Sequence, residues 1–206
     1  DDAPMAQEVD FIVAVGLAAC GNQSGSPQPV PIPDPKEFRS TTVLPGQPEE
    51  VRLVGLPKAT VGVGEVRVVN RDRGGEAIVQ ASAKGSFYAA ILADAGEVLE
   101  VSYEGSDPAL YTVPEEGVTG APAPTPIAGT PPLERLAGTA QVRLRGEAPA
   151  GTTSVLAVAT VGGDTVIAPV DAQLRFDATL LASPGETVEV FVNFGELGAP
   201  WTLTAP

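Results

Sequence analysis

One stretch of this sequence occurs twice, and that repeat constrains the fold more than any other feature of the chain. Residues 87–101 align without gaps on residues 176–190, and eight of the fifteen aligned positions are identical. A shorter match, of residues 51–53 with residues 142–144, precedes each copy by a similar distance. Two matches in the same order indicate two copies of one structural unit within the 206 residues.

Both copies alternate apolar and polar side chains, which is the pattern of half-buried strands. The apolar positions are Leu99, Val101 and Tyr103 in the first copy and Val188, Val190, Val192 and Phe194 in the second. A period of two is typical of an antiparallel sheet with one buried face, and no stretch sustains the helical period of 3.6. We therefore expect little helix. The predicted strands are 51–55, 63–69, 76–82, 85–93 and 96–105 in the first unit, and 142–146, 153–161, 164–170, 174–182 and 185–195 in the second.

The pattern G-S-F-x-A-x-I/L-x-A-x-x-G-E-x-L/V-x-V, at residues 85–101, resembles the bacterial immunoglobulin-like repeats of surface proteins. Fibronectin-III-like sandwiches share it. The resemblance implies an all-β chain of two tandem immunoglobulin-like antiparallel β-sandwiches, with roles in spacing, adhesion or assembly and no catalytic residues to carry over. Each unit has five clear strands, whereas such sandwiches have about seven. We expect the missing strands to come from residues 41–44, from residues 110–113 or from another subunit.

Proline-rich segments set the domain boundaries. We expect an N-terminal hydrophobic strand or signal-like segment at 1–20, a proline-rich arm at 21–48, a first domain at 49–106, a proline-rich linker at 107–139 and a second domain at 140–206. Prolines at every second position from Pro27 to Pro35 predict an extended and stiff arm. Because long proline-rich segments seldom order alone, the linker is expected to pack on a domain or on a neighbouring subunit.

The N-terminal hydrophobic segment has the alternation of a strand. Its large side chains are Val9, Phe11, Val13, Val15 and Leu17, and the positions between them are mostly small. A strand of this kind near a free terminus can complete the sheet of another molecule by strand addition. We therefore predict that these five residues form a subunit interface and that the chain associates with itself into a homopolymer. The alternative that the segment is an ordinary strand of its own domain stays open.

The same segment ends in a second motif. Leu17-Ala18-Ala19-Cys20 resembles the lipobox of bacterial lipoproteins, and a short polar tether follows it at residues 21–26. The acidic residues before it, with no Lys or Arg, differ from the positively charged start of a signal peptide. In this interpretation Cys20 is lipidated, which is the only route by which we expect membrane contact. Both interpretations place the protein outside the cell or on its surface.

Composition excludes several classes of function. The chain has no His, so Ser-His-Asp and Cys-His catalytic arrangements cannot form. A net charge of −14 leaves no basic surface for nucleic acid. A single Cys excludes an internal disulfide and a cysteine-based zinc site. We therefore expect a protein that is not an enzyme and that binds no nucleic acid.

No cofactor is expected, and calcium is the one metal that the sequence suggests at all. Asp72, Glu76, Asp107 and Asp164 lie at predicted turns, where hard cations take carboxylate ligands, although their spacing matches no EF-hand. Trp201 and Tyr111 are the aromatic residues that a sugar-binding platform would use. We expect Trp201, which follows Pro200 close to the C-terminus, to fill a core instead.

These observations predict a non-enzymatic extracellular structural protein. In the first hypothesis it is the subunit of a surface filament or pilus-like assembly, held by strand donation from residues 9–17. The alternative is a surface-anchored lipoprotein whose tandem immunoglobulin-like domains form a stalk or adhesion module. Whether the N-terminal strand pairs within one chain or between chains stays open at this point.

Overall fold

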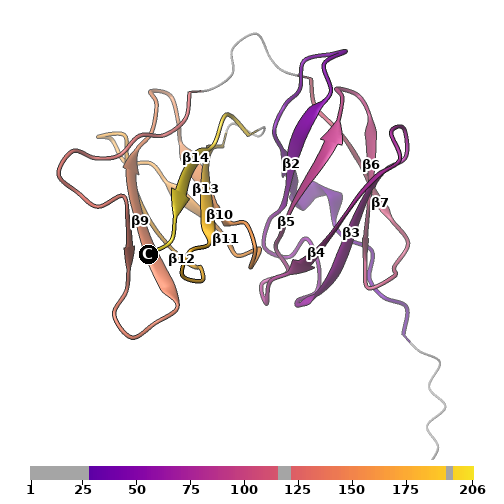
Figure 1. Ribbon diagram of the computed structural model, residues 1–206, viewed down its shortest axis with the longest axis horizontal. Coiled ribbons are helices and arrows are strands. Elements are labelled where there is room, and N and C mark those ends of the chain that lie inside the picture. The colour runs from indigo at the N-terminus through magenta and orange to yellow at the C-terminus, as the bar shows by residue number, and fades with distance from the viewer. Residues whose placement is uncertain (1–27, 116–121, 194–196) are drawn as a thin grey trace, which may run out of the picture.

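The computed structural model describes residues 28–115, 122–193 and 197–206 (Figure 1). The predicted donor strand at residues 9–17, the predicted lipidation site Cys20 and the apolar position Phe194 lie outside the described residues. Within the described part the chain forms fourteen strands and one three-residue 3-10 turn, η1 (Pro35–Glu37), so the expectation of little helix is confirmed. No helix among the described residues is long and apolar enough to cross a membrane.

The first seven strands form one antiparallel sandwich, domain 1. One sheet has the order β1-β2-β5 and the other has the order β4-β3-β6-β7. The bounds are β1 (Phe38–Ser40), β2 (Glu49–Gly55), β3 (Gly64–Asn70), β4 (Gly75–Ala81), β5 (Phe87–Ala93), β6 (Val98–Tyr103) and β7 (Ala109–Thr112).

The last seven strands repeat this arrangement as domain 2. The sheets are β12-β9-β8 and β11-β10-β13-β14, which is the topology of domain 1 with each strand number raised by seven. The bounds are β8 (Leu133–Arg135), β9 (Gln141–Glu147), β10 (Ser154–Ala159), β11 (Thr165–Pro169), β12 (Arg175–Leu181), β13 (Thr187–Val192) and β14 (Trp201–Thr204). The prediction of two tandem immunoglobulin-like sandwiches is therefore confirmed.

All ten strands predicted from the sequence are present, and the chain itself supplies the strands that seemed to be missing. β7 matches the predicted strand at residues 110–113 within one residue. β1 ends just before the predicted strand at residues 41–44, where Thr41 and Val43 instead form isolated bridges to Leu197 and Glu115. Strands this short contain no measurable alternation, so their place was hard to read from sequence.

Three of these short strands lie in segments that the sequence analysis assigned to connections. β1 is within the expected arm at 21–48, and β7 and β8 are within the expected linker at 107–139. The linker packs on domain 2, as expected: Pro124 is buried, and Thr125 and Glu147 exchange backbone hydrogen bonds of 2.9 and 2.8 Å. Proline is found at the ends of edge strands as well as in linkers, so a high proline content alone did not distinguish these short strands from connections.

The repeated sequence motifs build equivalent cores. Leu99, Val101 and Tyr103 are buried, as predicted, and so are Val188 and Val190 at the equivalent positions of domain 2. The shared glycine after each V-R-L opener makes room for a ring on the neighbouring strand. A Cβ on Gly55 would lie 2.2 Å from the Phe87 ring, and one on Gly146 would lie 2.6 Å from the Phe176 ring. Both glycines face these rings directly across the β2–β5 and β9–β12 ladders.

The two sandwiches pack side by side through their sheets (Figure 1). The outer face of β1-β2-β5 in domain 1 contacts the outer face of β10 and β13 in domain 2. The molecule is therefore a block of four sheet layers. Their order is β4-β3-β6-β7, then β1-β2-β5, then β11-β10-β13-β14, and finally β12-β9-β8.

Candidate functional site

The interface between the domains has an apolar centre, which is separate from the two sandwich cores. Domain 1 contributes Val54 and Leu56 from the end of β2, with Tyr88 of β5 packed beside them. Domain 2 contributes Leu156 and Val158 of β10, Phe191 of β13, and Leu197. Apart from Tyr88, these six residues are each at most 4 % exposed. Burial of six such side chains contributes on the order of 10 kcal/mol before entropy costs.

A buried carboxylate joins the domains at the same place. Glu189 of β13 is 6 % exposed and accepts hydrogen bonds from Arg52 Nε at 3.1 Å and from Tyr88 Oη at 2.9 Å. Burial opposes the charge of Arg52, but the attraction and hydrogen bond of Glu189 outweigh it and raise the pKa of the guanidinium. Burial, together with the charge of Glu189, raises the pKa of the Tyr88 hydroxyl. The charge of Glu189 is thus compensated by two groups from the other domain.

A second contact lies at the turn between β10 and β11. Ser86 Oγ donates to the Gly163 carbonyl at 2.7 Å, and Lys84 Nζ lies 2.8 Å from Asp164 Oδ1. Gly163 has a φ of +64°, and a Cβ there would lie 3.0 Å from the Gln80 carbonyl oxygen. This turn therefore approaches domain 1 closely enough that only glycine fits without a shift.

A third contact uses main-chain atoms. The Leu197 amide donates to the Ser40 carbonyl at 3.0 Å, and Thr41 pairs with Leu197 as an isolated parallel bridge. Domain 2 thereby pairs with the otherwise free edge of β1. Apolar, ionic and backbone contacts at three places hold the domains in one orientation, which a flexible linker alone would not do.

The face of domain 1 that corresponds to this docked face of domain 2 is open and charged. It holds a groove of about 370 Å³ along β3 and β6. Arg67 is paired with Glu76 at 2.7 Å, and Arg71 is paired with Glu100 at 2.8 Å. The groove is lined by Glu65, Arg67, Val69, Arg71, Glu100, Ser102, Glu104, Gly105, Ser106 and Pro108.

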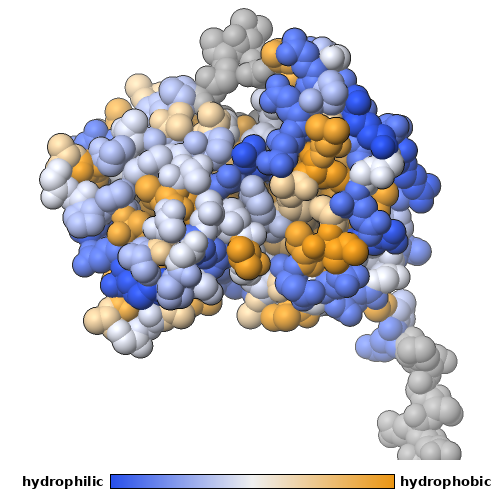
Figure 2. Space-filling view, in the orientation of Figure 1, coloured by the Kyte–Doolittle hydropathy of each residue, from blue (hydrophilic) through white to orange (hydrophobic). Residues whose placement is uncertain are grey.

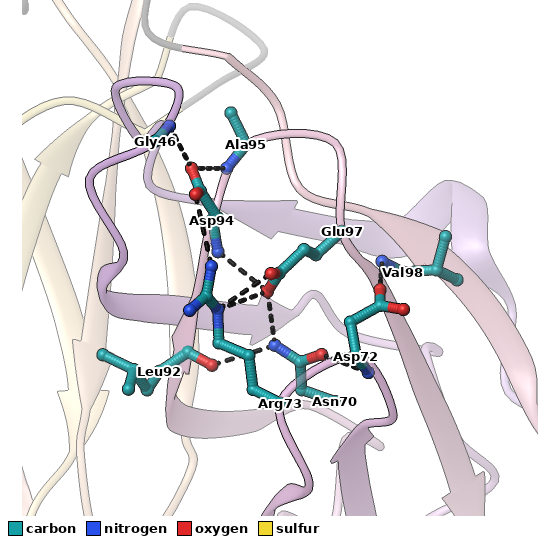
Figure 3. Close-up of polar contacts among 9 residues, drawn as sticks. All are labelled: Gly46, Asn70, Asp72, Arg73, Leu92, Asp94, Ala95, Glu97 and Val98. Atoms are coloured by element: carbon teal, nitrogen blue, oxygen red, sulfur yellow. Dashed lines mark hydrogen bonds and ion pairs between the residues drawn. The ribbon is translucent and has the colours of Figure 1, made fainter.

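A cluster of carboxylates closes one end of domain 1, and its charges are already compensated (Figure 3). Arg73 lies between Asp94 and Glu97, with contacts of 3.2 and 2.8 Å. Asn70, which is fully buried, donates to Glu97 Oε2 at 2.8 Å and to the Leu92 carbonyl at 3.0 Å. Burial opposes ionisation of Glu97, but hydrogen bonds from Asn70, the Asp94 amide and Arg73 outweigh it and lower the pKa of Glu97. These contacts of Asp94 and Glu97 fix the turn between β5 and β6.

The structure does not bring together the turn carboxylates that suggested calcium. Asp72 accepts from the Val98 amide at 3.5 Å, Glu76 pairs with Arg67, and Asp164 pairs with Lys84 at the domain interface. In the described part of the chain no three His, Cys, Asp or Glu side chains are grouped so that they could hold a metal ion. At the carboxylate cluster of Figure 3, the guanidinium of Arg73 stands where a cation would bind.

The two aromatic residues considered for sugar binding belong to different domains. Trp201 of β14 is half-buried against the core of domain 2, in agreement with its predicted role. Tyr111 of β7 is half-buried against the core of domain 1, where its hydroxyl lies 3.1 Å from Ser40 Oγ and its ring meets the edge of Phe38. They do not form a shared platform.

The sequence analysis missed the domain interface, although two strands contained a signal. Residues 154–159 of β10 form an almost unbroken apolar run, and Phe191 interrupts the polar face of β13. A continuous apolar run is typical of a strand that is buried on both faces. Both faces of β10 and β13 are buried here because one faces the core of domain 2 and the other faces domain 1.

Comparison with known proteins finds similar solved structures but no matching sequence family. No family model and no curated protein matches this chain. Among solved structures, the chain is similar to a two-domain fibronectin type-III segment of chicken tenascin, with 19% sequence identity and a TM-score of 0.26. That match covers 83% of this chain and 99% of the tenascin segment.

Proposed function

We propose that this chain is a non-enzymatic structural protein of an extracellular or cell-surface assembly, and that it forms a homopolymer by strand donation from residues 9–17. The observation that supports this most is that residues 38–204 supply seven strands to each sandwich. Neither domain needs the strand at residues 9–17, so this apolar segment is available for another subunit.

The docked domains suit a structural role. The interface between them combines a buried apolar centre, the Glu189–Arg52 ion pair and the close approach of Gly163. A subunit with this interface would behave as one rigid body, so a pulling force on one domain would be transmitted directly to the other. Flexible tandem domains would instead absorb it in the linker.

The donor segment has enough apolar surface to hold subunits together. Burying Val9, Phe11, Val13, Val15 and Leu17 would contribute roughly 8–15 kcal/mol before entropy costs, at about 1.5–3 kcal/mol each. Backbone pairing along a sheet edge would add register and direction. Together these would make subunit association strong at low concentrations.

The direct test is to remove residues 1–19 and measure assembly by sedimentation velocity. We expect polymers to be lost while folded monomers remain, because the deletion spares all fourteen described strands. A finer test compares Val13→Asp with Ala14→Asp, which add the same charge to the bulky and the small face of the segment. Assembly should be abolished by the first and largely kept by the second. Polymers that survive the deletion would overturn the proposal.

The alternative is a lipoprotein anchored at Cys20, and the path of the arm supports it. Residues 28–32 are exposed, and the arm first joins domain 1 where Pro33 is buried and the Asp34 amide donates to the Ala59 carbonyl at 3.0 Å. The prolines before this point would serve as the spacer to a membrane. Side-by-side packing makes the domains a block rather than an extended stalk.

The intact mass and N-terminal sequence of the protein from its natural source separate the two proposals. A chain beginning at an acylated Cys20 would establish the lipoprotein and remove the donor strand. An unmodified chain that retains residues 9–17 would exclude lipid anchoring and leave strand donation as the function of this segment.

A further inference from the structure

Two exposed apolar positions are kept in both domains, while the residues around them differ. Ile78 on β4 and Ile167 on β11 are equivalent, with exposed fractions of 57% and 45%. Leu92 on β5 and Leu181 on β12 are equivalent, with exposed fractions of 53% and 47%. Because both copies keep an aliphatic side chain at these outer positions, the surroundings of each one decide whether it can border an added strand.

In domain 1 these residues flank an open side of the sandwich. β4 and β5 are the edge strands of their two sheets, and they follow each other in the chain. Figure 2 shows apolar side chains gathered over this side of domain 1, between charged surroundings. A sheet edge bordered by apolar residues is the surface on which an added strand can both form hydrogen bonds and bury side chains.

Among the described edge strands, β4 is the one best suited to receive a strand. β1 and β8 have three residues, β7 and β14 have four, and β11 ends at Pro169. β4 has seven residues and no proline. The outer face of β5 enters the domain interface through Tyr88, and the outer face of β12 is polar at three of its four positions.

The inner face of β4 is also incompletely covered. Ala77 and Val79 face the core of domain 1 but are only half-buried, whereas Val66 and Val68 on the neighbouring strand β3 are fully buried. The margin of the core beside β4 therefore lacks a covering row of side chains. A strand with one bulky apolar face would supply that row.

We propose that residues 9–17 of one copy add to the edge of β4 in a second copy, along the part of β4 before Gln80, because the domain 2 turn at Gly163 approaches the Gln80 carbonyl. This inference rests on the proposed function and names its acceptor. The bulky face of the segment would continue the inner row beside Val79, and Ile12, the one large residue of the other face, would lie beside Ile78. Residues 28–32 are exposed and run away from the domain (Figure 1).

The test compares Ile78→Lys with Ile167→Lys in the full chain. Both residues are about half exposed, so neither change should unfold a domain. Ile78→Lys should weaken assembly at least about tenfold, because a charge replaces a buried aliphatic contact, whereas Ile167→Lys should stay within about twofold. Equal effects of the two variants, or no effect of either, would overturn the assignment to β4.

A cross-link tests the pairing itself. One chain has Ile12→Cys, a second has Ile78→Cys or, as the control, Ile167→Cys, and all have Cys20→Ser. Mixed and oxidised, the chains should form a disulfide-linked heterodimer with Ile78→Cys only, because a disulfide needs Cα atoms within about 7 Å. Polymers of the full chain without this cross-link would overturn the β4 assignment and leave the proposed function standing. A full chain that stays monomeric would overturn both. A disulfide that forms only within a chain having both substitutions would overturn donation between copies.

Discussion

The two domains share several inner residues and differ at several outer ones, and these outer differences decide which faces of the domains dock. In the sheets that contain β2 and β9, Val51, Leu53 and Gly55 recur unchanged as Val142, Leu144 and Gly146. Among the outward residues of these sheets, Arg52 recurs as Arg143, but Val54 is replaced by Arg145 and Tyr88 is replaced by Asp177. The apolar version of this face is docked on domain 2, and the charged version is open.

In the sheets β4-β3-β6-β7 and β11-β10-β13-β14 the outer faces also differ, but here the apolar face belongs to domain 2 and the charged face to domain 1. Leu156 and Phe191 of domain 2 are buried in the domain interface. The equivalent residues of domain 1, Arg67 and Ser102, line the open groove. Even a shared residue changes its partner, because Glu189 binds Arg52 across the interface whereas the equivalent Glu100 binds Arg71 of its own domain. The inner positions therefore specify the sandwich, and a few outer positions specify which faces dock.

The largest effect should come from giving the docked face the residue of the open one. Phe191→Ser places the domain 1 residue in the apolar centre of the interface. We expect a loss of about 3–5 kcal/mol, the usual cost of removing a buried aromatic side chain. Denaturant unfolding should then show two transitions in place of one, and small-angle scattering should show a larger radius of gyration.

The matched control is Ser102→Ala at the equivalent open position. It should change the free energy of unfolding by less than about 0.5 kcal/mol, as surface substitutions do. A single unfolding transition with unchanged midpoint in Phe191→Ser would show that the domain interface contributes little to stability.

The second effect tests the close approach of the domains at equivalent turns. Gly163 and Gly74 both have positive φ, +64° and +72°, but a Cβ on Gly74 would meet nothing within 4 Å. Both Gly→Ala changes should cost about 1–2 kcal/mol for the left-handed backbone. Gly163→Ala should cost about 1–3 kcal/mol more, because its methyl group would press on the Gln80 carbonyl. Equal midpoints of thermal unfolding for the two variants would contradict this account.

Much of the fold could be predicted from the sequence because inner positions leave a regular trace. Alternation located all ten long strands, and the repeat of residues 87–101 in residues 176–190 showed that there are two units. β1, β8 and β14 were missed because three or four residues are too few for alternation to be recognised. The domain interface was missed for another reason. Burial of Leu156 and Phe191 depends on which faces meet, and that is decided by contacts between distant parts of the chain, such as hydrogen bonds between residues 77 to 137 positions apart.

A third effect concerns the shared glutamates. Glu189→Gln removes the charge that binds Arg52 but keeps an acceptor for Tyr88. We expect a loss of about 1.5–3 kcal/mol, since hydrogen bonds to charged groups are the stronger ones. Glu100→Gln changes a pair whose arginine, Arg71, is largely exposed, and it should cost less than about 1 kcal/mol. Chemical denaturation of the two variants under identical salt measures the difference, and equal losses would contradict the assignment of Glu189 as an interface residue.

The smallest effect depends on pH and is confined to alkaline conditions. Burial raises the pKa of Tyr88 in the folded protein, whereas an unfolded tyrosine ionises near pH 10. A raised folded pKa gives stability that is complete below the unfolded pKa and is lost as the pH rises through the folded pKa. Between these two values the wild type should lose up to about 1.4 kcal/mol per pH unit at this one group. Tyr88→Phe, which has no hydroxyl to ionise, should lose less on going from pH 9 to pH 11, although it starts from a lower stability because Glu189 loses a donor. Urea unfolding of both proteins at these two pH values gives the comparison, and parallel losses would show that Tyr88 ionises in the folded protein as readily as in water.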